Sequence, residues 1–303
     1  MQIRKVLVPI DFSPSSKVAL NHGIAFARSF RSELTLLHVI DSTALAYTFP
    51  SETTRFESKR AQQVRTILQA LAPADLPDHV QVQVVVTSGN IEDQILSTIY
   101  EQETDLLVMG TRGRGLVSRL LIGSVTESML RKVKVPMLTV CGNAPVPSFD
   151  RILFATDLSE ESKREARFAL ELAQMKNARL IALHAVDEGN LRYAGFPIEE
   201  DTGRNLLDEA RGKLDEFEAL AACERVKAET IVARGPAAEA ILKTAETNSV
   251  DLIMMTVGKK GLLERTLLGS TAEHVVREAH IPVLSIPTHR IHRTQEIPDT
   301  RAA

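Results

Sequence analysis

Hydrophobic residues in the first half of the chain follow two alternating patterns. Short, nearly continuous apolar runs alternate with longer segments whose apolar residues recur at helical spacing. The runs predict five strands, at residues 3–9, 34–40, 81–87, 105–109 and 135–140. The spaced segments predict helices at residues 14–29, 55–71, 91–102 and 124–132. Apolar strands separated by helices are typical of a parallel sheet covered by helices on both faces.

The second half of the chain repeats the first. The two halves align without gaps at an offset of 146 residues, since Asp11 corresponds to Asp157 (157 − 11 = 146). The same offset carries LTLLHVID at 34–41 onto LIALHAVD at 180–187. Solenoid repeats are about 20 to 50 residues long. A repeat as long as this one therefore indicates a duplicated domain.

The repeat defines the expected fold and domains. We predict an α/β protein made of two tandem doubly wound, Rossmann-like domains, each with a five-stranded parallel sheet and flanking helices. The first copy spans 1–143 and the second copy spans 149–288, followed by a tail at 289–303. The glycine and prolines of CGNAPVPSFD mark the boundary between the copies.

Composition and charge exclude several classes of protein. The net charge of -3 argues against a broad, non-specific grip on nucleic acid or on an anionic membrane. No apolar run approaches the roughly 20 residues of a membrane span, and MQIRKVLVPIDF has no signal-peptide layout. The two cysteines, Cys141 and Cys223, form no CxxC or Cys/His cluster. We therefore expect a cytoplasmic protein that binds neither nucleic acid nor membrane.

Glycines are concentrated in the segment VMGTRGRGLVSRLLIGSVTESML, residues 108–130. This loop follows a predicted strand and ends at the helix that begins at Ser124, which is where doubly wound sheets bind ligands. A helix N-terminus attracts anions, and glycine lets the backbone approach a phosphate closely. Alternatively, the glycines simply make the turn and Ser124 caps the helix. The loop matches neither GxxxxGK[ST] nor GxGxxG.

The spacing Gly110-x-x-Gly113, nine residues, then Gly123-Ser124 resembles the nucleotide loop of the universal stress protein family, in its ATP-binding branch. The segments VLVPIDFSPSSKVAL, LLHVID and VPMLTV resemble the family's pattern in the same order. The resemblance covers 3–140 and again about 150–286. The chain is thus similar to a tandem universal stress protein.

The resemblance implies that the first copy binds an adenine nucleotide, as ATP alone or with Mg²⁺. Asp11 and Val39 would hold the adenine, and the loop would take the ribose and phosphates. The implied binding residues are Pro9, Asp11, Val39, Gly89, Gly110, Arg112, Gly113, Gly123, Ser124, Val125 and Thr126. From the residues alone, Asp11 has the alternative of an N-cap or Asx-turn at the following helix. His38 and His184, in apolar strands, are expected to be hydrogen-bonded strand residues.

The second copy departs from this pattern. Gly110 is replaced by Thr256, Gly113 by Lys259 and Val39 by Ala185. If Gly110 has a positive φ, threonine in its place would be strained, and the second loop would follow another path. We expect the second copy to bind ATP weakly or not at all. Its weaker candidate residues are Asp157, Gly235, Gly261, Gly269, Ser270 and Thr271.

The chain shows no catalytic or metal-ligand constellation by motif. The leading hypothesis is an ATP-binding stress-response or signalling protein with little or no turnover. One alternative is an interaction scaffold in which nucleotide is incidental, and another is a slow ATPase. The resemblance implies that 135–140 and 281–286 pair as the last strands of the two copies. That pairing would make the chain a pseudo-dimeric monomer. A homodimer and an unidentified protein partner also remain as hypotheses.

Overall fold

The computed structural model describes residues 3–41, 50–73, 75–111, 122–187, 200–258 and 269–288, without the side chains of 50–58 and 200–203. The first copy contains β1 (Lys5–Pro9), α1 (Pro14–Phe30), β2 (Glu33–Ile40), α3 (Pro50–Leu71), β3 (Val82–Ser88), α4 (Ile91–Glu101), β4 (Leu106–Gly110), α5 (Ser124–Lys132) and β5 (Met137–Val140). The second copy contains β6 (Arg151–Ala155), α6 (Glu160–Lys176), β7 (Arg179–Val186), α8 (Glu200–Cys223), β8 (Lys227–Arg234), α9 (Ala237–Thr247), β9 (Leu252–Val257), α10 (Ser270–Glu278) and β10 (Val283–Pro287). The predicted α/β fold and its repeat are confirmed.

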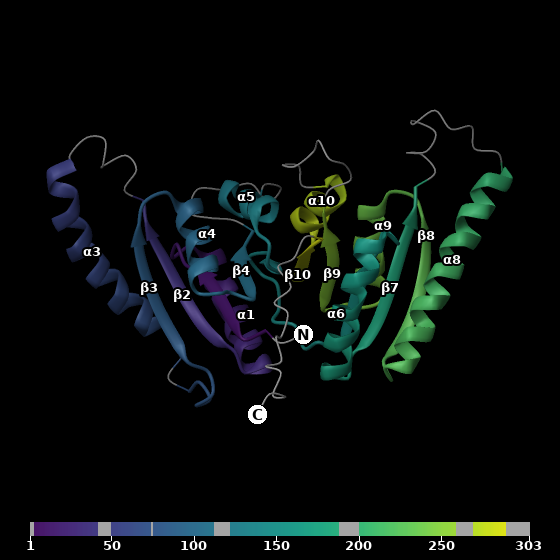
Figure 1. Ribbon diagram of the computed structural model, residues 1–303, viewed down its shortest axis with the longest axis horizontal. Coiled ribbons are helices and arrows are strands. Elements are labelled where there is room, and N and C mark those ends of the chain that lie inside the picture. Colours follow the sequence, from purple (N-terminus) through teal and green to yellow (C-terminus); the bar gives the residue numbers. More distant parts are fainter. Residues whose placement is uncertain are drawn as a thin grey trace, which may run out of the picture.

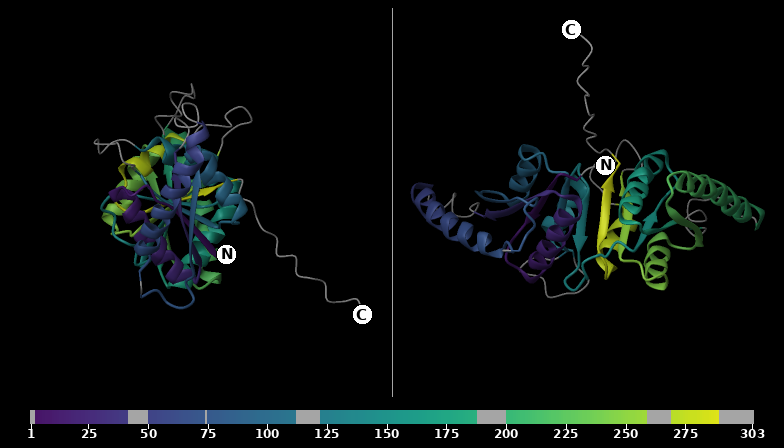
Figure 2. Two further views of the ribbon diagram at one scale, coloured as in Figure 1. Left: turned by 90° about the vertical axis from the view of Figure 1, so that its left-hand side faces the viewer. Right: turned by 90° about the horizontal axis from the view of Figure 1, so that it is seen from below.

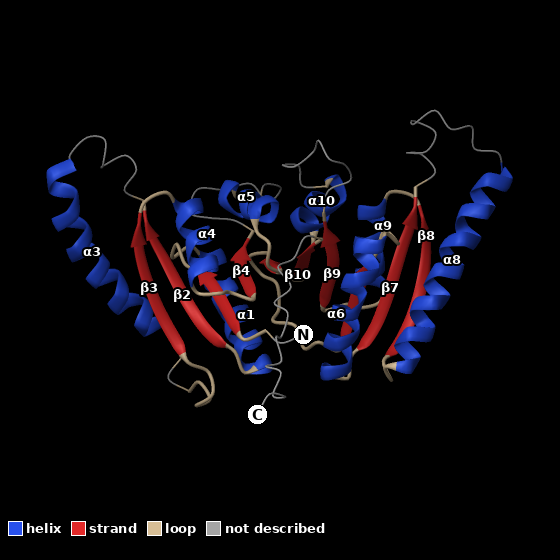
Figure 3. Cartoon of the chain, in the orientation of Figure 1, coloured by secondary structure: helices blue, strands red, loops and turns tan. Residues whose placement is uncertain are grey.

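The strands form one ten-stranded sheet in the order β3-β2-β1-β4-β5-β10-β9-β6-β7-β8 (Figures 1 and 3). Within each copy all strand pairs are parallel. The copies meet where β5 pairs with β10 in antiparallel orientation. The two predicted five-stranded sheets are therefore continuous with each other.

The β5–β10 pair has pseudo-two-fold symmetry. Leu138 lies opposite Leu284, which is its own equivalent in the second copy (284 − 138 = 146). On either side of this pair, Thr139 lies opposite Val283 and Met137 lies opposite Ser285. The expected pairing of the last strands is therefore confirmed, and it occurs within one chain.

Each face of the sheet carries a hydrophobic core shared by the two copies. One core includes Phe26 and Leu68 of the first copy together with Phe168 and Ala221 of the second. Helices α1, α3, α6 and α8 therefore cover this face. The other core lies under α4, α5, α9 and α10. Seen from below, the molecule is elongated, with α3 and α8 at opposite ends (Figure 2).

The connection between the copies packs against both of them. His22, fully buried in α1, has its Nε2 3.0 Å from the Pro145 carbonyl oxygen. Phe149 makes an edge contact with Phe26, and the Lys176 Nζ lies 5.0 Å from the centre of the Phe149 ring. Burial lowers the pKa of Lys176. The connection is thus part of the packed structure and adds to the contact between the copies.

In the part of the chain that the structure describes, no helix combines the length and hydropathy that crossing a bilayer requires. Cys141 and Cys223 are both free cysteines.

Candidate functional site

The candidate site lies where the strand order of the first copy reverses. β1 and β4 are neighbours, but β1 continues toward β2 and β4 continues toward β5. The chain therefore leaves the carboxyl ends of β1 and β4 in opposite directions, which opens a crevice between them. The turn at 10–13 follows β1, and Thr111 follows β4, at this point of the sheet. The equivalent crevice of the second copy lies between β6 and β9.

The turn after β1 is fixed by its own side chains. Asp11 Oδ1 accepts a hydrogen bond from Ser13 N at 2.9 Å, and Ser13 Oγ accepts one from Ser16 N at 3.1 Å. Ser13 is therefore the N-cap of α1, and Asp11 forms the Asx-turn that was one of its two sequence interpretations. Phe12 between them has a φ of 63°. Bulky residues rarely adopt this conformation, so the turn is held under strain.

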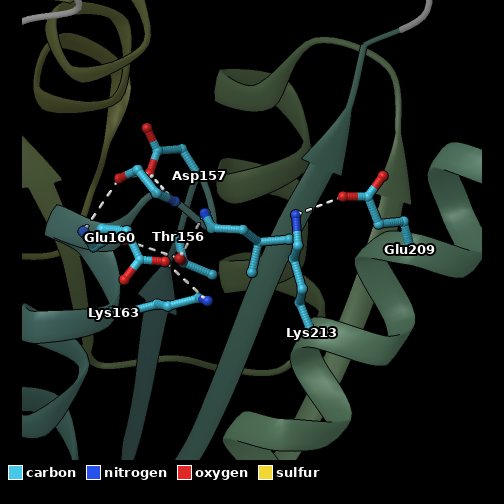
Figure 4. A network of polar contacts seen from close by, with 9 residues as sticks. Thr156, Asp157, Glu160, Lys163, Glu209 and Lys213 are labelled. Atoms are coloured by element: carbon cyan, nitrogen blue, oxygen red, sulfur yellow. Dashed lines mark hydrogen bonds and ion pairs between the residues drawn. The ribbon is translucent and has the colours of Figure 1, made fainter.

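The second copy repeats this turn. Leu158 has a φ of 60°, and Asp157 Oδ1 accepts hydrogen bonds from the backbone and the hydroxyl of Ser159, at 3.1 and 2.6 Å. The strain is therefore a property of the fold and not of one copy. Figure 4 shows Asp157 beside Thr156 and the first turn of α6.

The end of β2 provides backbone groups beside this turn. Ile10 N donates to Leu37 O at 2.7 Å, beyond the last β1–β2 register pair. Because alternate residues of a strand point to the same neighbour, the N–H and C=O of Val39 face the space beyond the end of β1. A donor and an acceptor on one residue match the hydrogen-bonding edge of an adenine ring.

His38 stabilises the same turn and was correctly predicted to be a hydrogen-bonded strand residue. Its Nδ1 lies 2.6 Å from the Ile10 carbonyl oxygen, and its ring packs against Phe12 at a centroid distance of 4.9 Å. In the second copy His184 Nδ1 lies 2.9 Å from the Thr156 carbonyl oxygen. Both histidines fasten the turn after the first strand of their copy.

Gly110, the last residue of β4, is required by close packing. A Cβ atom at this position would lie 2.7 Å from the Cβ and 2.8 Å from the backbone of Ser15 in α1. Among the described glycines only Gly89 and Gly235 have a positive φ. The condition raised from the sequence, a positive φ at Gly110, is therefore not met. Thr126 Oγ1 donates to the Gly110 carbonyl at 2.8 Å, so α1, β4 and α5 meet at this residue.

The N-terminus of α5 offers hydrogen-bond donors to the crevice. Gly123 is its N-cap, in extended conformation (φ −64°, ψ 141°), and no side chain caps the helix. By contrast, α1, α4 and α6 are each capped by a side chain. Ser124, the first residue of α5, is exposed, and Val125 is half-buried. Uncapped amides with the positive end of the helix dipole fit an anionic group such as a phosphate.

Other predicted residues of the first copy lie around this centre or outside the described part of the chain. Pro9 is half-buried and pairs with Leu37. Gly89 has a φ of 134° and turns the chain from β3 into α4, three strands away from β4. The hydroxyl of Thr126 already binds Gly110. Arg112 and Gly113 lie outside the described residues. Among the residues that are described, no three metal-ligating side chains form a group.

The second crevice has a different lining. Thr256 replaces Gly110, Ala272 replaces Thr126, and Glu161 replaces Ser15. The Thr256 hydroxyl donates to Ser162 Oγ at 3.4 Å. Since threonine has the Cβ that Gly110 lacks, α6 must begin farther from β9 than α1 does from β4. The first turn of α6 also carries Glu160 and Glu161, whereas α1 has no acidic residue there.

The remaining candidates of the second copy are only partly assembled. Asp157, Gly269 and Ser270 are exposed, and Thr271 is half-buried. Gly269 is an N-cap without a side-chain cap, as Gly123 is. Gly235 has a φ of 105° and turns the chain from β8 into α9. Gly261 lies outside the described residues.

A polar network that the sequence did not reveal holds α5 against α4. Glu92 Oε2 accepts hydrogen bonds from Ser128 Oγ at 2.5 Å and from Lys132 Nζ at 2.6 Å. These bonds, that of Lys132 above all, lower the pKa of Glu92. The second copy has Ala238, His274 and Glu278 at the same positions. The residues lie far apart in the sequence, and no local motif connects them.

The fold and the site define a class: a duplicated, doubly wound α/β protein whose copies are joined through their last strands, with a helix N-terminus that no side chain caps at the first switch point. The sequence profile of the Universal stress protein family matches residues 2–140 and again 148–287. The chain belongs to the universal stress protein family.

Relatives of both one-copy and two-copy length are found. A universal stress protein of Methanocaldococcus jannaschii is 36% identical over 142 residues, 46% of this chain and 82% of that protein. One from Mycolicibacterium smegmatis is 26% identical over 290 residues, 93% of this chain and 96% of that protein. The crystal structure of a universal stress protein from Archaeoglobus fulgidus covers 95% of this chain and 100% of its own, with a TM-score of 0.71 and 23% identity. That last similarity supports the fold of the whole tandem chain.

Proposed function

We propose that the first copy binds ATP in the crevice between β1 and β4. The observation that carries this proposal is the uncapped N-terminus of α5, fastened to Gly110 beside the Asp11 turn. The α5 amides would receive the phosphates, and Asp11 and the backbone of Val39 would receive the adenine. When bound, Mg²⁺ would neutralise phosphate charge. Among the described residues, no three metal-ligating side chains are grouped so that they could hold this ion.

The second copy is proposed to bind ATP weakly or not at all. Its crevice carries Glu160 and Glu161 in the first turn of α6, where a triphosphate would meet like charge. Repulsion between a carboxylate and a phosphate in a partly buried crevice is not fully screened by water. Thr256 also stands in place of the closely packed Gly110, so the second site has a different lining. One nucleotide per chain is therefore expected.

We infer that bound ATP serves as a signal for stress adaptation more than as a substrate. Within the described part of the chain, no three metal-ligating side chains form a group. The strained turn at Phe12 and the α5 N-terminus belong to different elements, so one ligand would link them. The second candidate function, an interaction scaffold, is favoured by the β5–β10 pairing, which needs no nucleotide.

The test is to denature freshly purified protein and to quantify the released nucleotides by ion-exchange chromatography with mass detection. About one ATP per chain supports the proposal. Two would contradict the assignment of the second copy, and ADP would indicate hydrolysis. No nucleotide, together with no rise in melting temperature on adding excess ATP, would favour the scaffold.

A pair of equivalent variants locates the site. Gly123→Val introduces a side chain among the α5 amides without backbone strain, because Gly123 has a φ of −64°. We expect this variant to lose the nucleotide while keeping its melting temperature within a few degrees. Gly269→Val is the matched change in the second copy, where φ is −59°. It should retain the nucleotide; loss of nucleotide only in Gly269→Val would place the site in the second copy instead.

A further inference from the structure

In the part of the chain that the structure describes, the ten-stranded sheet ends at β3 on one side and at β8 on the other. In the β2–β3 ladder, Leu34 N donates to Gln81 O at 2.8 Å. Since alternate residues face the same neighbour, Val82, Val84 and Val86 direct their backbone N–H and C=O groups away from the sheet. Unpaired backbone groups of this kind are a template for another strand.

The two edges differ in charge. β3, with the sequence VQVVVTS, contains no charged residue. β8, with the sequence KAETIVAR, contains Lys227, Glu229 and Arg234. Charged side chains protect an edge strand against pairing with a copy of itself. β3 has no charged side chain to protect it in this way. It therefore also has no side chain that would repel the charged residues of β8.

The helices next to these edges have opposite charges. By sequence α3 has four basic and two acidic residues, whereas α8 has three basic and seven acidic residues. Lys59, Arg60 and Arg65 are exposed on α3. On α8, Arg211 and Lys213 are paired with Asp208 and Glu209 of the same helix, at 3.1 and 2.6 Å. The exposed acids that follow them on α8 are Asp215, Glu216 and Glu218.

The topology determines how two ends of different molecules would meet. The strands of the first copy run antiparallel to those of the second, and α3 and α8 pack on the same face of the sheet. When β3 of one molecule is added beside β8 of another so that α3 and α8 lie on the same face of the joined sheet, the two strands are antiparallel and the two helices are side by side. In that pair the first half of α3, with Lys59 and Arg60, lies beside the second half of α8.

Pairing of like ends would be unfavourable by the same geometry. Two β3 edges would bring two basic α3 helices together, and two β8 edges would bring two acidic α8 helices together. Like charges in contact oppose association, and opposite charges steer it. The charges of the outer helices thus select the unlike pair.

We propose that this protein associates end to end with further copies of itself, through β3 and α3 of one molecule and β8 and α8 of the next. Such an interface uses two different surfaces of each molecule, so it leads to open chains of molecules unless the rotation closes a ring. The proposal concerns the ends of the sheet and does not depend on nucleotide binding.

Sedimentation velocity over a range of protein concentrations tests the proposal. At low ionic strength we expect the average mass to rise above the 33.4 kDa of one chain without a limit at two chains. In about 1 M salt the mass should return to that of one chain, because screening then acts within about 3 Å. A constant mass of one chain at low salt would overturn the proposal. So would association that salt strengthens, since that result indicates pairing of like ends.

Charge reversal adds a test of the partner surfaces. One variant carries Lys59→Glu, Arg60→Glu and Arg65→Glu, and the other carries Asp215→Lys, Glu216→Lys and Glu218→Lys. Each variant alone has outer helices of like sign and should remain a single chain. An equimolar mixture should associate again, because each end then meets the opposite charge. A mixture that stays monomeric would contradict the end-to-end arrangement.

A third variant tests the strand pairing itself. Val84→Pro removes an outward N–H without breaking a bond to β2. It should abolish association at low salt while keeping the far-ultraviolet circular dichroism and nucleotide content of the parent protein. Unchanged association in Val84→Pro would show that β3 does not pair with another strand and would overturn that part of the proposal.

Discussion

Position 110 shows how a single residue distinguishes the two copies. The first copy has glycine there, in contact with Ser15 and bonded through its carbonyl to Thr126. The second copy has Thr256 and, in place of Thr126, Ala272. In the first copy the hydroxyl group at this contact is that of Thr126 on α5, and in the second copy it is that of Thr256 on β9. The packing around this position therefore differs between the two copies.

At this scale we predict that Gly110→Ala destabilises the protein. The added Cβ would lie 2.7 to 2.8 Å from Ser15, so α1 must shift, at a cost of about 1–3 kcal/mol in the free energy of unfolding. The shift would also move the Asp11 turn, so ATP affinity should fall. Urea denaturation and titration calorimetry measure the two effects.

Gly142→Ala is the control for this variant. A Cβ at Gly142 would have no neighbour within 4 Å, so its free energy of unfolding should change by less than about 0.5 kcal/mol. If Gly110→Ala proved as stable as Gly142→Ala, close packing would not be the reason for glycine at 110.

At the scale of elements, α5 depends on α4 for its position. Glu92, at the start of α4, binds both Ser128 and Lys132 of α5 through one oxygen. A carboxylate with a lowered pKa stabilises the fold above its ordinary pKa, and this contribution is lost as the pH falls through the lowered value. The network therefore fixes the proposed phosphate-binding end of α5 at neutral pH and releases it in acid.

We predict that Glu92→Gln lowers the free energy of unfolding by about 1 kcal/mol at pH 7. The difference from the parent protein should be present above the ordinary glutamate value of 4.5 and should disappear as the pH falls below it. Urea denaturation at several pH values checks both statements.

Glu209→Gln provides the comparison. In the parent protein, the hydrogen bond that Lys213 donates to Glu209 also lowers the pKa of Glu209, but both residues lie on the same helix, α8. Glu209→Gln should change the free energy of unfolding less than Glu92→Gln does, and it should leave the affinity for ATP unchanged. A pH-independent effect of Glu92→Gln would show that its charge is not what holds α5.

At the scale of the whole molecule, the copies form one folding unit. They share both hydrophobic cores and one continuous sheet. The connection contacts His22 of α1 through Pro145 and Lys176 of α6 through Phe149. The β5–β10 ladder does not depend on the connection. The copies should therefore stay together when the connection is cut.

We predict that a protease site inserted after the exposed Val146 can be cleaved without separating the copies. The two fragments should elute together in size-exclusion chromatography at the volume of the uncut protein, while a denaturing gel shows complete cleavage. The uncut insertion variant is the control. Elution as two half-size species would contradict a shared core and indicate that the connection holds the copies together.

The sequence predicted the elements well because their signals are local. The apolar runs and helical spacings place the five strands of the first copy in the correct segments, and the 146-residue offset reveals the duplication. Asp11 and Gly123-Ser124 were found in the same way, since each stands next to a strand end or a helix start. The hydrogen bonds that Ser128 and Lys132 donate to Glu92 were not found, because these residues lie 36 and 40 positions away from Glu92 in the sequence.

What the sequence by itself determined is the content of each copy: which segments are strands, which are helices, and which loop can approach an anion. These follow from periodicity and from residue types that act within a few positions of one another. Only the tertiary structure decided that Gly110 is glycine because Ser15 lies against it, and that Leu138 faces Leu284 at a pseudo-two-fold axis. It also decided that basic α3 and acidic α8 stand at opposite ends of one sheet. Such contacts depend on how distant segments pack, and packing is a property of the whole chain.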